Sequence, residues 1–273
     1  MIAWTNLEQA LTGFKCVANN LRESFRALAW GREHGSVVEL PGISIASLGV
    51  AFQMFNAAFL SAPVEHELAL DERLRIARDY FSLRGMRWAF WICEDWIGSA
   101  SVRRKLSRAC ESAGLRLSSE MPGLAAERLA APSRELPALE YRRVESEPTR
   151  NDFCALGASC FHVPIGWFAE VFNESITGDH PFVCWVGYRD GEPVATAATI
   201  SYQGVIGLYN VATAPESRRR GCAEAITRHA IAVAARQNGA ARTVLQSTSG
   251  GLRLYQRIGF QPVTRILVYN SVP

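Results

Sequence analysis

Several signatures of specialised proteins are missing from this sequence of 273 residues. Its seven cysteines are scattered and form no CxxC pair, which argues against a disulfide framework and against a zinc site. No stretch of about 18 uncharged apolar residues occurs, and the first residues hold no basic segment followed by an apolar one. We therefore expect a cytoplasmic protein that contains neither a membrane span nor a bound metal.

A strong charge of one sign is also missing. The net charge of +3 comes from 29 basic and 26 acidic residues, and no basic stripe with interleaved aromatic residues runs along the chain. We therefore expect no nucleic-acid partner. Two common nucleotide-binding patterns, GxGxxG and a glycine-rich loop ending in Gly-Lys-Ser or Gly-Lys-Thr, do not occur either. Hydrophobic residues make up 48% of the chain, which is enough for a sizeable core.

The segment 131–137 looks like a linker, because it contains two prolines and several polar residues and the apolar pattern restarts after it. It divides the chain into an N-terminal domain, residues 1–131, and a C-terminal domain, residues 138–273. Apolar periodicity predicts these N-terminal elements: a helix from residue 5 to about 30, strand material at 37–50 broken by Pro41-Gly42, a helix at 68–84, a strand at 88–93, a helix at 102–113, and weaker strands at 115–119 and 125–129.

The C-terminal domain is predicted to contain elements in the order β, α, α, β, β, β, α, β, α, β. Their ranges are 139–144, 150–161, 167–175, 182–188, 193–202, 205–213, 220–237, 242–247, 250–257 and 260–269. Asp190-Gly191 indicates a hairpin turn, and Asn238-Gly239 indicates a helix C-terminus. This order predicts an α/β fold with a mixed, mostly antiparallel central sheet flanked by helices, beside a second, smaller α/β domain at the N-terminus.

A turn rich in arginine, Arg218-Arg219-Arg220-Gly221-Cys222-Ala223, stands between a predicted strand and a predicted helix. Glycine lets the backbone approach a ligand closely, and the start of a helix offers unpaired N–H groups and the positive end of its dipole. The arginines add charge, and the small Ala223 keeps the first helical turn open. These features suit a pyrophosphate, although a basic surface loop is the alternative for a turn this short.

The stretch from Leu208 to Ala223 resembles motif A of the GNAT N-acyltransferase superfamily, which consists of a strand, a turn and a helix. The family's turn has Gln or Arg, then Gly three residues on, then Gly or Ala; Arg218, Gly221 and Ala223 fill these positions. Further on, Leu254 to Phe260 resembles the family's motif B, LYxxxGF. The resemblance covers about Leu139 to Val272, half of the chain.

The resemblance implies an N-acetyltransferase that transfers the acyl group of acetyl-CoA to a primary amine by direct attack in a ternary complex. In the family, the motif A strand lies along the pantetheine arm, the turn holds the pyrophosphate, and a tyrosine corresponding to Tyr255 protonates the leaving thiolate. A core aromatic is the alternative for Tyr255. The cofactor-binding residues implied are Val211, Ala212, Thr213, Arg218, Arg219, Arg220, Gly221, Cys222 and Ala223.

The general base and the acceptor are not identified by the sequence. An alkyl ammonium with a pKa of about 10.4 must lose a proton before it attacks. Tyr209-Asn210 stand where relatives often have a glutamate that helps to remove this proton. Thr248 stands where many relatives have Asn. The acceptor is a small-molecule or a protein amine. Residues of the acceptor-side segment are more often surface or structural residues: His162, Glu170, Glu174, Asp179 and His180. His229 falls in mid-helix and is expected to be structural.

The N-terminal domain contains neither motif, so we predict a degenerate GNAT-like or accessory domain that does not bind acyl-CoA. Its expected role is to cover the catalytic domain, to shape the acceptor cleft or to form a homodimer. Trp88, Trp91 and Trp96 are expected to pack in a core, because large aromatic residues dominate cores. Two alternatives to an enzyme remain open: a non-catalytic acyl-CoA sensor, and an interaction scaffold that has lost the cofactor.

Overall fold

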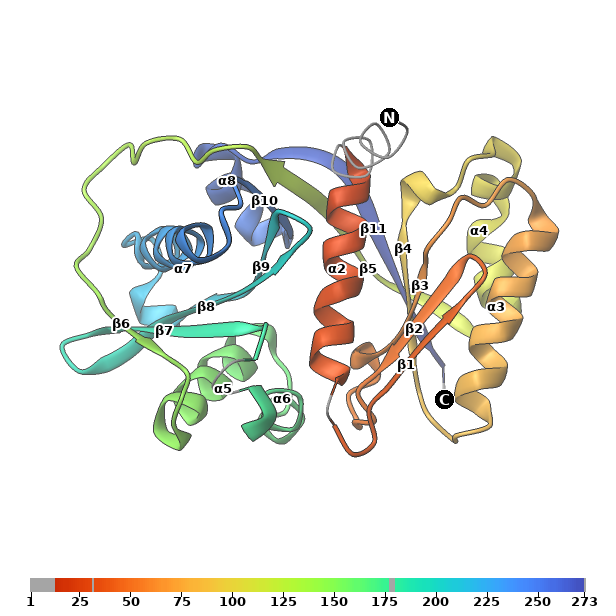
Figure 1. The fold of residues 1–273 in the computed structure, drawn as a ribbon, viewed down its shortest axis with the longest axis horizontal. Helices are drawn as coiled ribbons and strands as arrows, with labels where there is room; N and C mark the ends of the chain where they lie inside the picture. The colour runs from red at the N-terminus through yellow and green to blue at the C-terminus, as the bar shows by residue number, and fades with distance from the viewer. Residues whose placement is uncertain (1–12, 31, 177–179, 273) are drawn as a thin grey trace. The chain divides into compact units, whose positions relative to one another are not determined.

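A computed structural model of the protein describes residues 13–30, 32–176 and 180–272, which form two compact units (Figure 1). The N-terminal unit comprises Gly13–Gly123 and Val263–Pro273, and the C-terminal unit comprises Leu124–Pro262. Two long strands, β5 (Leu115–Ala126) and β11 (Gln261–Ser271), each begin in one unit and end in the other. The last strand of the chain therefore belongs to the unit that its N-terminal half forms.

The N-terminal unit is a mixed sheet with helices on both faces. Its strands lie in the order β1-β2-β3-β4-β11-β5; β3 and β4 are parallel, whereas β1–β2, β2–β3 and β4–β11 are antiparallel pairs. Figure 1 shows α2 on one face and α3 and α4 on the other. The elements are α2 (Phe14–Ala29), β1 (Ser36–Leu40), β2 (Ile43–Ser47), η1 (Gln53–Phe55), β3 (Asn56–Leu60), α3 (Glu67–Ser82), β4 (Ala89–Cys93), η2 (Glu94–Trp96) and α4 (Ala100–Ser112).

Aromatic residues form the two halves of the core in this unit, one on each face of β4. Trp91 packs edge-on against Phe25 of α2, with ring centroids 5.2 Å apart. Successive strand residues point to opposite faces, and Trp88, on the other side, stacks on Phe81 of α3 at 5.1 Å. The tryptophans Trp88, Trp91 and Trp96 are 4%, 8% and 6% exposed, which confirms that they pack in a core.

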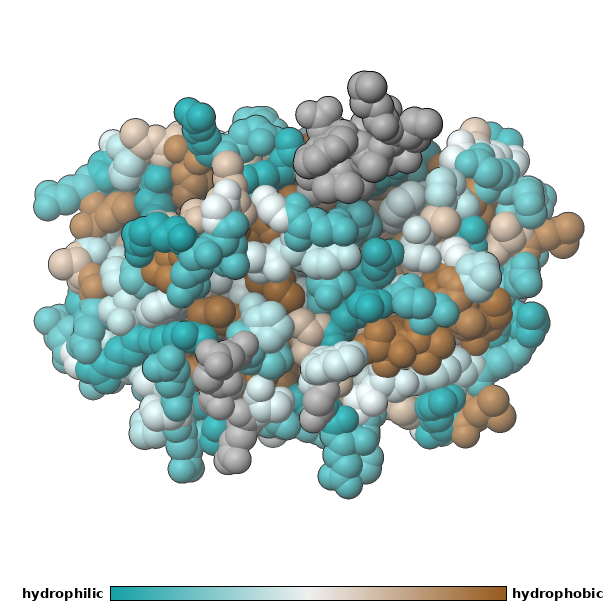
Figure 2. Space-filling model, viewed as in Figure 1, coloured by the Kyte–Doolittle hydropathy of each residue, from teal (hydrophilic) through white to brown (hydrophobic). Residues whose placement is uncertain are grey.

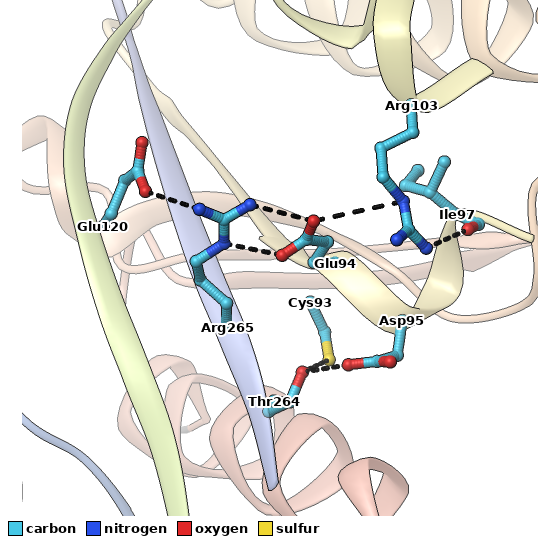
Figure 3. A network of polar contacts seen from close by, with 8 residues as sticks. All are labelled: Cys93, Glu94, Asp95, Ile97, Arg103, Glu120, Thr264 and Arg265. Carbon is cyan, nitrogen blue, oxygen red and sulfur yellow. Dashed lines mark hydrogen bonds and ion pairs between the residues drawn. The ribbon is translucent and has the colours of Figure 1, made fainter. Parts of the chain in front are cut away.

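A polar network fastens β11 to its neighbours inside the N-terminal unit (Figure 3). The guanidinium of Arg265 donates two hydrogen bonds to Glu94, at 2.6 and 2.9 Å, and one to Glu120 at 3.0 Å. The hydroxyl of Thr264 donates to Asp95 at 2.6 Å and contacts the Cys93 thiol at 3.0 Å. Burial raises the pKa of Cys93 to about 12, so this thiol stays protonated and is not a nucleophile.

The C-terminal unit has strands in the order β5-β10-β9-β8-β7-β6, in which β9 and β10 are parallel and β6 to β9 form antiparallel pairs. Figure 1 shows α7 on one face of β7–β9 and α5 and α6 on the other. The elements are β6 (Glu140–Arg143), α5 (Glu147–Phe161), α6 (Ile165–Val171), η3 (Glu174–Ile176), β7 (Val183–Arg189), β8 (Glu192–Tyr202), β9 (Val205–Thr213), η4 (Pro215–Ser217), α7 (Cys222–Asn238), β10 (Arg242–Gln246) and α8 (Ser249–Arg257).

Alternation along β7 explains how both faces of this sheet are covered. The hydroxyl of Tyr188 donates to Asp152 of α5 at 2.5 Å. The preceding residue, Gly187, faces α7, where a side chain would stand 3.4 Å from Ile226. The indole of Trp185, on the same face, packs edge-on against His229 of α7, with centroids 4.6 Å apart. The tighter contact of a side chain at position 187 would be with Leu139, at 3.2 Å, so glycine here leaves room for the Leu139 side chain.

Most of the predicted elements are confirmed, including every strand and helix of the C-terminal order and the Asp190-Gly191 turn, where both residues have positive φ. Two expectations were wrong. Strand β3 was not predicted, and the two weak strands at 115–119 and 125–129 are one strand, β5, because Pro122-Gly123 lies within it without ending it. The helix predicted over 167–175 ends at Val171 and is followed by the short η3.

The seven cysteines are all free thiols, and six of them are buried, as expected. The predicted linker, 131–137, lies inside the C-terminal unit, whose boundaries fall at 123/124 and 262/263. The division into domains at this linker stays a prediction. Residues 5–12 of the first predicted helix and Asp179 lie outside the described residues.

Polar residues prevail on the molecular face drawn in Figure 2, with apolar residues in smaller patches. One such patch lies over β1 and β2, where Leu40 is 39% exposed. Among the described helices, none has both the length and the apolar character needed to cross a bilayer.

A half-buried histidine of the C-terminal unit predicts a pH-dependent stability. His229 stacks on Tyr141 at 3.9 Å, and burial, with Arg236 nearby, lowers its pKa. A base whose pKa is lowered by folding contributes stability above its unfolded pKa of about 6.5 and loses it as the pH falls. Urea unfolding at pH 7.5 and 5.5 should show a smaller loss of stability for His229→Phe than for the wild type. The exposed His162→Gln is the control; equal losses in all three proteins would contradict this role.

Candidate functional site

The parallel strands β9 and β10 are paired only over the first three residues of β9. Their paired residues are Arg242 with Val205, Thr243 with Ile206 and Val244 with Gly207. Beyond Gly207, β9 continues to Thr213, paired on its other side with β8 only. The residues of β9 change at this point from buried to mostly half-buried. The divergence opens one edge of β9 for an extended ligand in the manner of an added strand.

A β-bulge marks the same half of β9. Thr196 of β8 pairs with Ala212 and Ala198 pairs with Tyr209, so two residues of β9, Asn210 and Val211, lie opposite one residue of β8. Asn210 has φ +49°, a left-handed conformation that Asn tolerates better than most residues. Its carbonyl accepts a hydrogen bond from the Thr196 hydroxyl at 2.8 Å. The bulge turns the backbone of β9 and leaves ladder groups unpaired near Val211.

The arginine-rich turn follows β9 directly and leads into α7. Gly221 is the N-cap residue of α7, with φ +91°, and no side chain caps the helix. The first N–H groups of a helix have no acceptor within it, and Cys222 and Ala223 are the residues that carry them here. The turn therefore presents backbone donors at the positive end of the α7 dipole, which suits an anion.

The arginines of the turn differ in their contacts. Arg218 folds back to the end of β9, where its Nε donates to the Thr213 carbonyl at 3.2 Å and Nη2 lies 3.9 Å from the Cys160 sulfur. Arg219, with φ +62°, and Arg220 are exposed. The structure thus brings the predicted residues Val211 to Thr213 and Arg218 to Ala223 into one continuous segment at the open edge of β9.

A buried carboxylate that the sequence did not single out joins the two motif helices. Glu224 of α7 is 1% exposed; it accepts hydrogen bonds from Arg228 at 2.8 and 3.0 Å and from Arg257 of α8 at 3.0 Å. Burial alone would raise the pKa of Glu224, but the hydrogen bonds from Arg257 and Arg228 outweigh burial and lower it. The carboxylate thereby fixes α8, which carries Tyr255, to the first turn of α7.

Tyr255 lies in the apolar core of the C-terminal unit, 8% exposed, together with Leu208 of β9 and Leu245 of β10. Its ring packs edge-on against Phe260 at 5.7 Å. No described residue forms a hydrogen bond with its hydroxyl, and burial raises its pKa well above the usual value of 10.0. The phenol is therefore protonated at physiological pH and can donate a hydrogen bond to a ligand.

The candidates for a general base do not gather at this edge. His162 and Glu170 are exposed on or next to α5 and α6, and His180 accepts a hydrogen bond from the Phe182 N–H at 3.0 Å, ahead of β7. The side chain of Glu174 lies outside the described structure, as does Asp179. Nothing in the described part of the chain forms a group of three His, Cys, Asp or Glu side chains fit to hold a metal ion.

The corresponding crossover of the N-terminal unit, β3–α3–β4, is closed. Past the paired residues of β3 and β4, the Val64 N–H donates to the Trp96 carbonyl at 2.7 Å, and the Gly98 N–H donates to the Val64 carbonyl at 3.1 Å. The side chain of His66 caps α3 by accepting from the Ala69 N–H at 3.2 Å. Arg73 occupies the turn, donating to the carbonyls of Ala62 and Pro63 at 2.8 and 2.9 Å. No open edge or free helix start remains there among the described residues.

Comparison with known proteins identifies the part of the chain that contains this site. Residues 180–262 match the family model of the acetyltransferase (GNAT) domain. This segment of the chain is therefore similar to the GNAT domain. The match includes the divergent strands β9 and β10, the arginine-rich turn, α7 and α8. Against curated proteins, the sequence has no match.

Solved structures show that the GNAT-type fold extends over nearly all of the chain. A GCN5-related N-acetyltransferase from Kribbella flavida superposes with a TM-score of 0.71 and 21% identity, covering 94% of this chain and 96% of that one. A functionally unknown conserved protein from Staphylococcus epidermidis gives 0.61 and 13%, with coverage of 87% and 94%. A GCN5-related N-acetyltransferase from Sphaerobacter thermophilus gives 0.57 and 15%, with coverage of 84% and 76%.

The left-handed glycine at the start of α7 gives a sharp test of the GNAT site. Gly221→Ala places a Cβ 3.0 Å from Pro137 at a φ of +91°, and the turn must shift to relieve the strain. We expect CoA affinity to fall about 10-fold or more, as for the loss of one or two hydrogen bonds to a charged group. Calorimetric titration with CoA measures this change.

The other end of the same helix supplies the matched control. Gly239 has φ +64° and open space around it, so Gly239→Ala introduces a similar backbone strain of about 1 kcal/mol without touching the turn. Both variants should lose comparable stability in urea. Unchanged CoA affinity in Gly221→Ala, or an equal loss in Gly239→Ala, would contradict the placement of the site.

Proposed function

We propose that this protein is an N-acetyltransferase that transfers an acetyl group from acetyl-CoA to a primary amine. The observation that carries the proposal is the juxtaposition of an open edge on β9 with an uncapped, glycine-initiated helix start. The edge offers backbone groups to the amide-containing pantetheine arm, and the helix start offers N–H donors to a pyrophosphate. The similarity of residues 180–262 to the GNAT domain supports the same assignment.

The bulge in β9 supports a role in the chemical step. In acyl transfer to an amine, the nitrogen attacks the thioester carbon, negative charge develops on the carbonyl oxygen, and the C–S bond then breaks. A backbone N–H directed at that oxygen stabilises the charge. The unpaired groups next to Val211 lie at the point where β9 bends, and we assign the oxyanion donor to this segment.

Tyr255 is assigned to the leaving group. A free thiol has a pKa of about 8.5, whereas burial keeps the pKa of Tyr255 well above 10. Because full proton transfer from the phenol to the thiolate is therefore uphill, the hydroxyl acts first as a hydrogen-bond donor that stabilises the developing thiolate. The proton lost by the attacking ammonium balances the proton that the thiol finally gains, and water carries it in the absence of an identified base.

The N-terminal unit is proposed to be a degenerate copy of the same fold. Its connectivity, antiparallel strands followed by β3–α3–β4–α4–β5, repeats that of β9–α7–β10–α8–β11. In each unit the crossover strands are parallel and adjacent. The closure of its crossover by Val64, His66 and Arg73 supports the prediction that it does not bind acyl-CoA.

A non-catalytic acyl-CoA sensor is the second candidate. The observation that favours it is that His162 and Glu170 are exposed and that His180 accepts a hydrogen bond from the Phe182 N–H. The described residues of the acceptor segment therefore supply no base beside β9. A sensor predicts tight CoA binding without thiol release for any amine. It also predicts that Tyr255→Phe has little effect on the affinity for CoA.

Tyr255→Phe separates the two candidates, because it keeps the ring packed against Phe260 and removes only the hydroxyl. For an enzyme, we expect kcat for thiol release with the best amine of a broad panel to fall about 100-fold, the low end for removing one hydrogen-bond donor to a charge that develops in the transition state. The Kd for acetyl-CoA should change less than threefold, because the contacts of the ring remain. Thiol release by the wild type is followed with a thiol reagent, and binding by calorimetry.

The same assay contains the outcomes that would overturn the proposal. An absence of CoA binding to the wild type excludes both an acetyltransferase and a sensor. Tight binding with no turnover on any amine favours the sensor.

In an active enzyme, a rate that rises with pH up to 10 without a basic decline is expected, since Tyr255 stays protonated over this range.

A further inference from the structure

A segment outside the matched GNAT residues covers the pyrophosphate turn. The nearest groups to the side-chain position of Gly221 are Pro137 Cδ at 3.0 Å, Arg134 Nη2 at 3.5 Å and Leu136 Cδ2 at 3.6 Å. All of these residues belong to the C-terminal unit. Leu136 and Pro137 are half-buried, so they hold the segment in place, whereas Arg134 is exposed. We call residues 134–137 the covering segment.

The guanidinium of Arg134 has no carboxylate to neutralise it among the described residues. Three other arginines of the unit form ion pairs: Arg228 and Arg257 with Glu224, and Arg242 with Glu127 at 2.6 Å. The exposed Arg219 and Arg220 of the turn, like Arg134, form no ion pair among the described residues. Arg134 instead lies over Gly221, at the turn whose N–H groups are uncapped. A free guanidinium beside a set of free amides is a further donor for the same anion, because its planar fork matches two phosphate oxygens.

We infer that Arg134 is a ligand for the pyrophosphate of CoA and donates to it together with the amides of the turn. This inference rests on the proposed function and adds to it a binding residue that lies outside both motifs. Arg218, by contrast, donates to the Thr213 carbonyl and braces the turn rather than facing its open side. The covering segment, which lies between β5 and β6, would therefore contribute to the affinity for the acyl donor.

The test compares Arg134→Gln and Arg134→Lys with Arg236→Gln in the full-length protein. Arg236 is an exposed arginine in the last turn of α7, so its replacement removes the same charge far from the turn. CoA, dephospho-CoA and pantetheine are titrated into each protein by calorimetry. Dephospho-CoA keeps the pyrophosphate and lacks only the 3′-phosphate, whereas pantetheine has no phosphate.

Arg134→Gln should weaken CoA and dephospho-CoA alike, by about 10-fold to 100-fold, the range for one hydrogen bond between charged groups. Pantetheine affinity should not change, Arg134→Lys should recover part of the loss, and Arg236→Gln should bind as the wild type does. Thermal unfolding should be unchanged in every variant, because Arg134 is exposed.

Other results would overturn the inference in distinguishable ways. If the wild type binds CoA and Arg134→Gln binds it equally well, Arg134 is not a ligand, and the proposed function stands. If only CoA is weakened and dephospho-CoA is not, Arg134 contacts the 3′-phosphate and the pyrophosphate assignment is wrong. If pantetheine weakens equally, the segment acts through packing alone. If the wild type binds no CoA, the proposed function and this inference both fail.

Discussion

The separation of β9 from β10 after Gly207 and Val244 is the constraint on which the candidate site depends. Up to Gly207, β9 is buried and paired with β10; beyond it, this pairing ends. The bulge at Asn210 then bends β9, and the strand leads into a helix start that no side chain caps. The N-terminal unit shows the alternative outcome for the same crossover. There, hydrogen bonds between Val64 and the Trp96–Gly98 segment keep the strands joined, and His66 and Arg73 occupy the helix start. This difference is the basis for proposing that only the C-terminal unit binds the acyl donor.

Rigidity in the C-terminal unit comes from contacts that join parts far apart in the sequence. Glu224 fixes α8 to α7, so that the turn and Tyr255 are held by one buried carboxylate. Replacing a buried carboxylate that pairs with two arginines leaves both arginines without a partner and lowers stability. The ion pairs therefore hold the two short motifs, on α7 and α8, in a fixed position relative to each other. Thr196 holds the bulge by bonding the Asn210 carbonyl. Gly187 leaves room for the Leu139 side chain beside β7, and the stacked Tyr141 and His229 join β6 to α7.

Local features were predictable from the sequence because their causes are local. Asp190-Gly191 indicated a tight hairpin, Asn238-Gly239 indicated the end of α7, and Gly221 indicated a turn whose backbone can approach a ligand closely. Features that depend on distant partners were not predictable. The hydrogen bonds that close the crossover at Val64, the pairing of Glu224 with Arg257, and the approach of Arg134 to Gly221 leave no periodic trace in the sequence. Strand β11 follows α8 directly, yet it pairs with β4, from which it is separated by most of the chain; β5 was divided in the prediction because proline and glycine usually end a strand.

Amide hydrogen exchange with and without acetyl-CoA tests the central claim most directly, because it locates the donor on the backbone. The account predicts slower exchange in Val211–Thr213 and in Arg219–Ala223, together with the covering segment, and no change in residues 61–69 ahead of and within α3. Protection of the turn before α3, or no protection around Gly221 at a saturating concentration of acetyl-CoA, would contradict it.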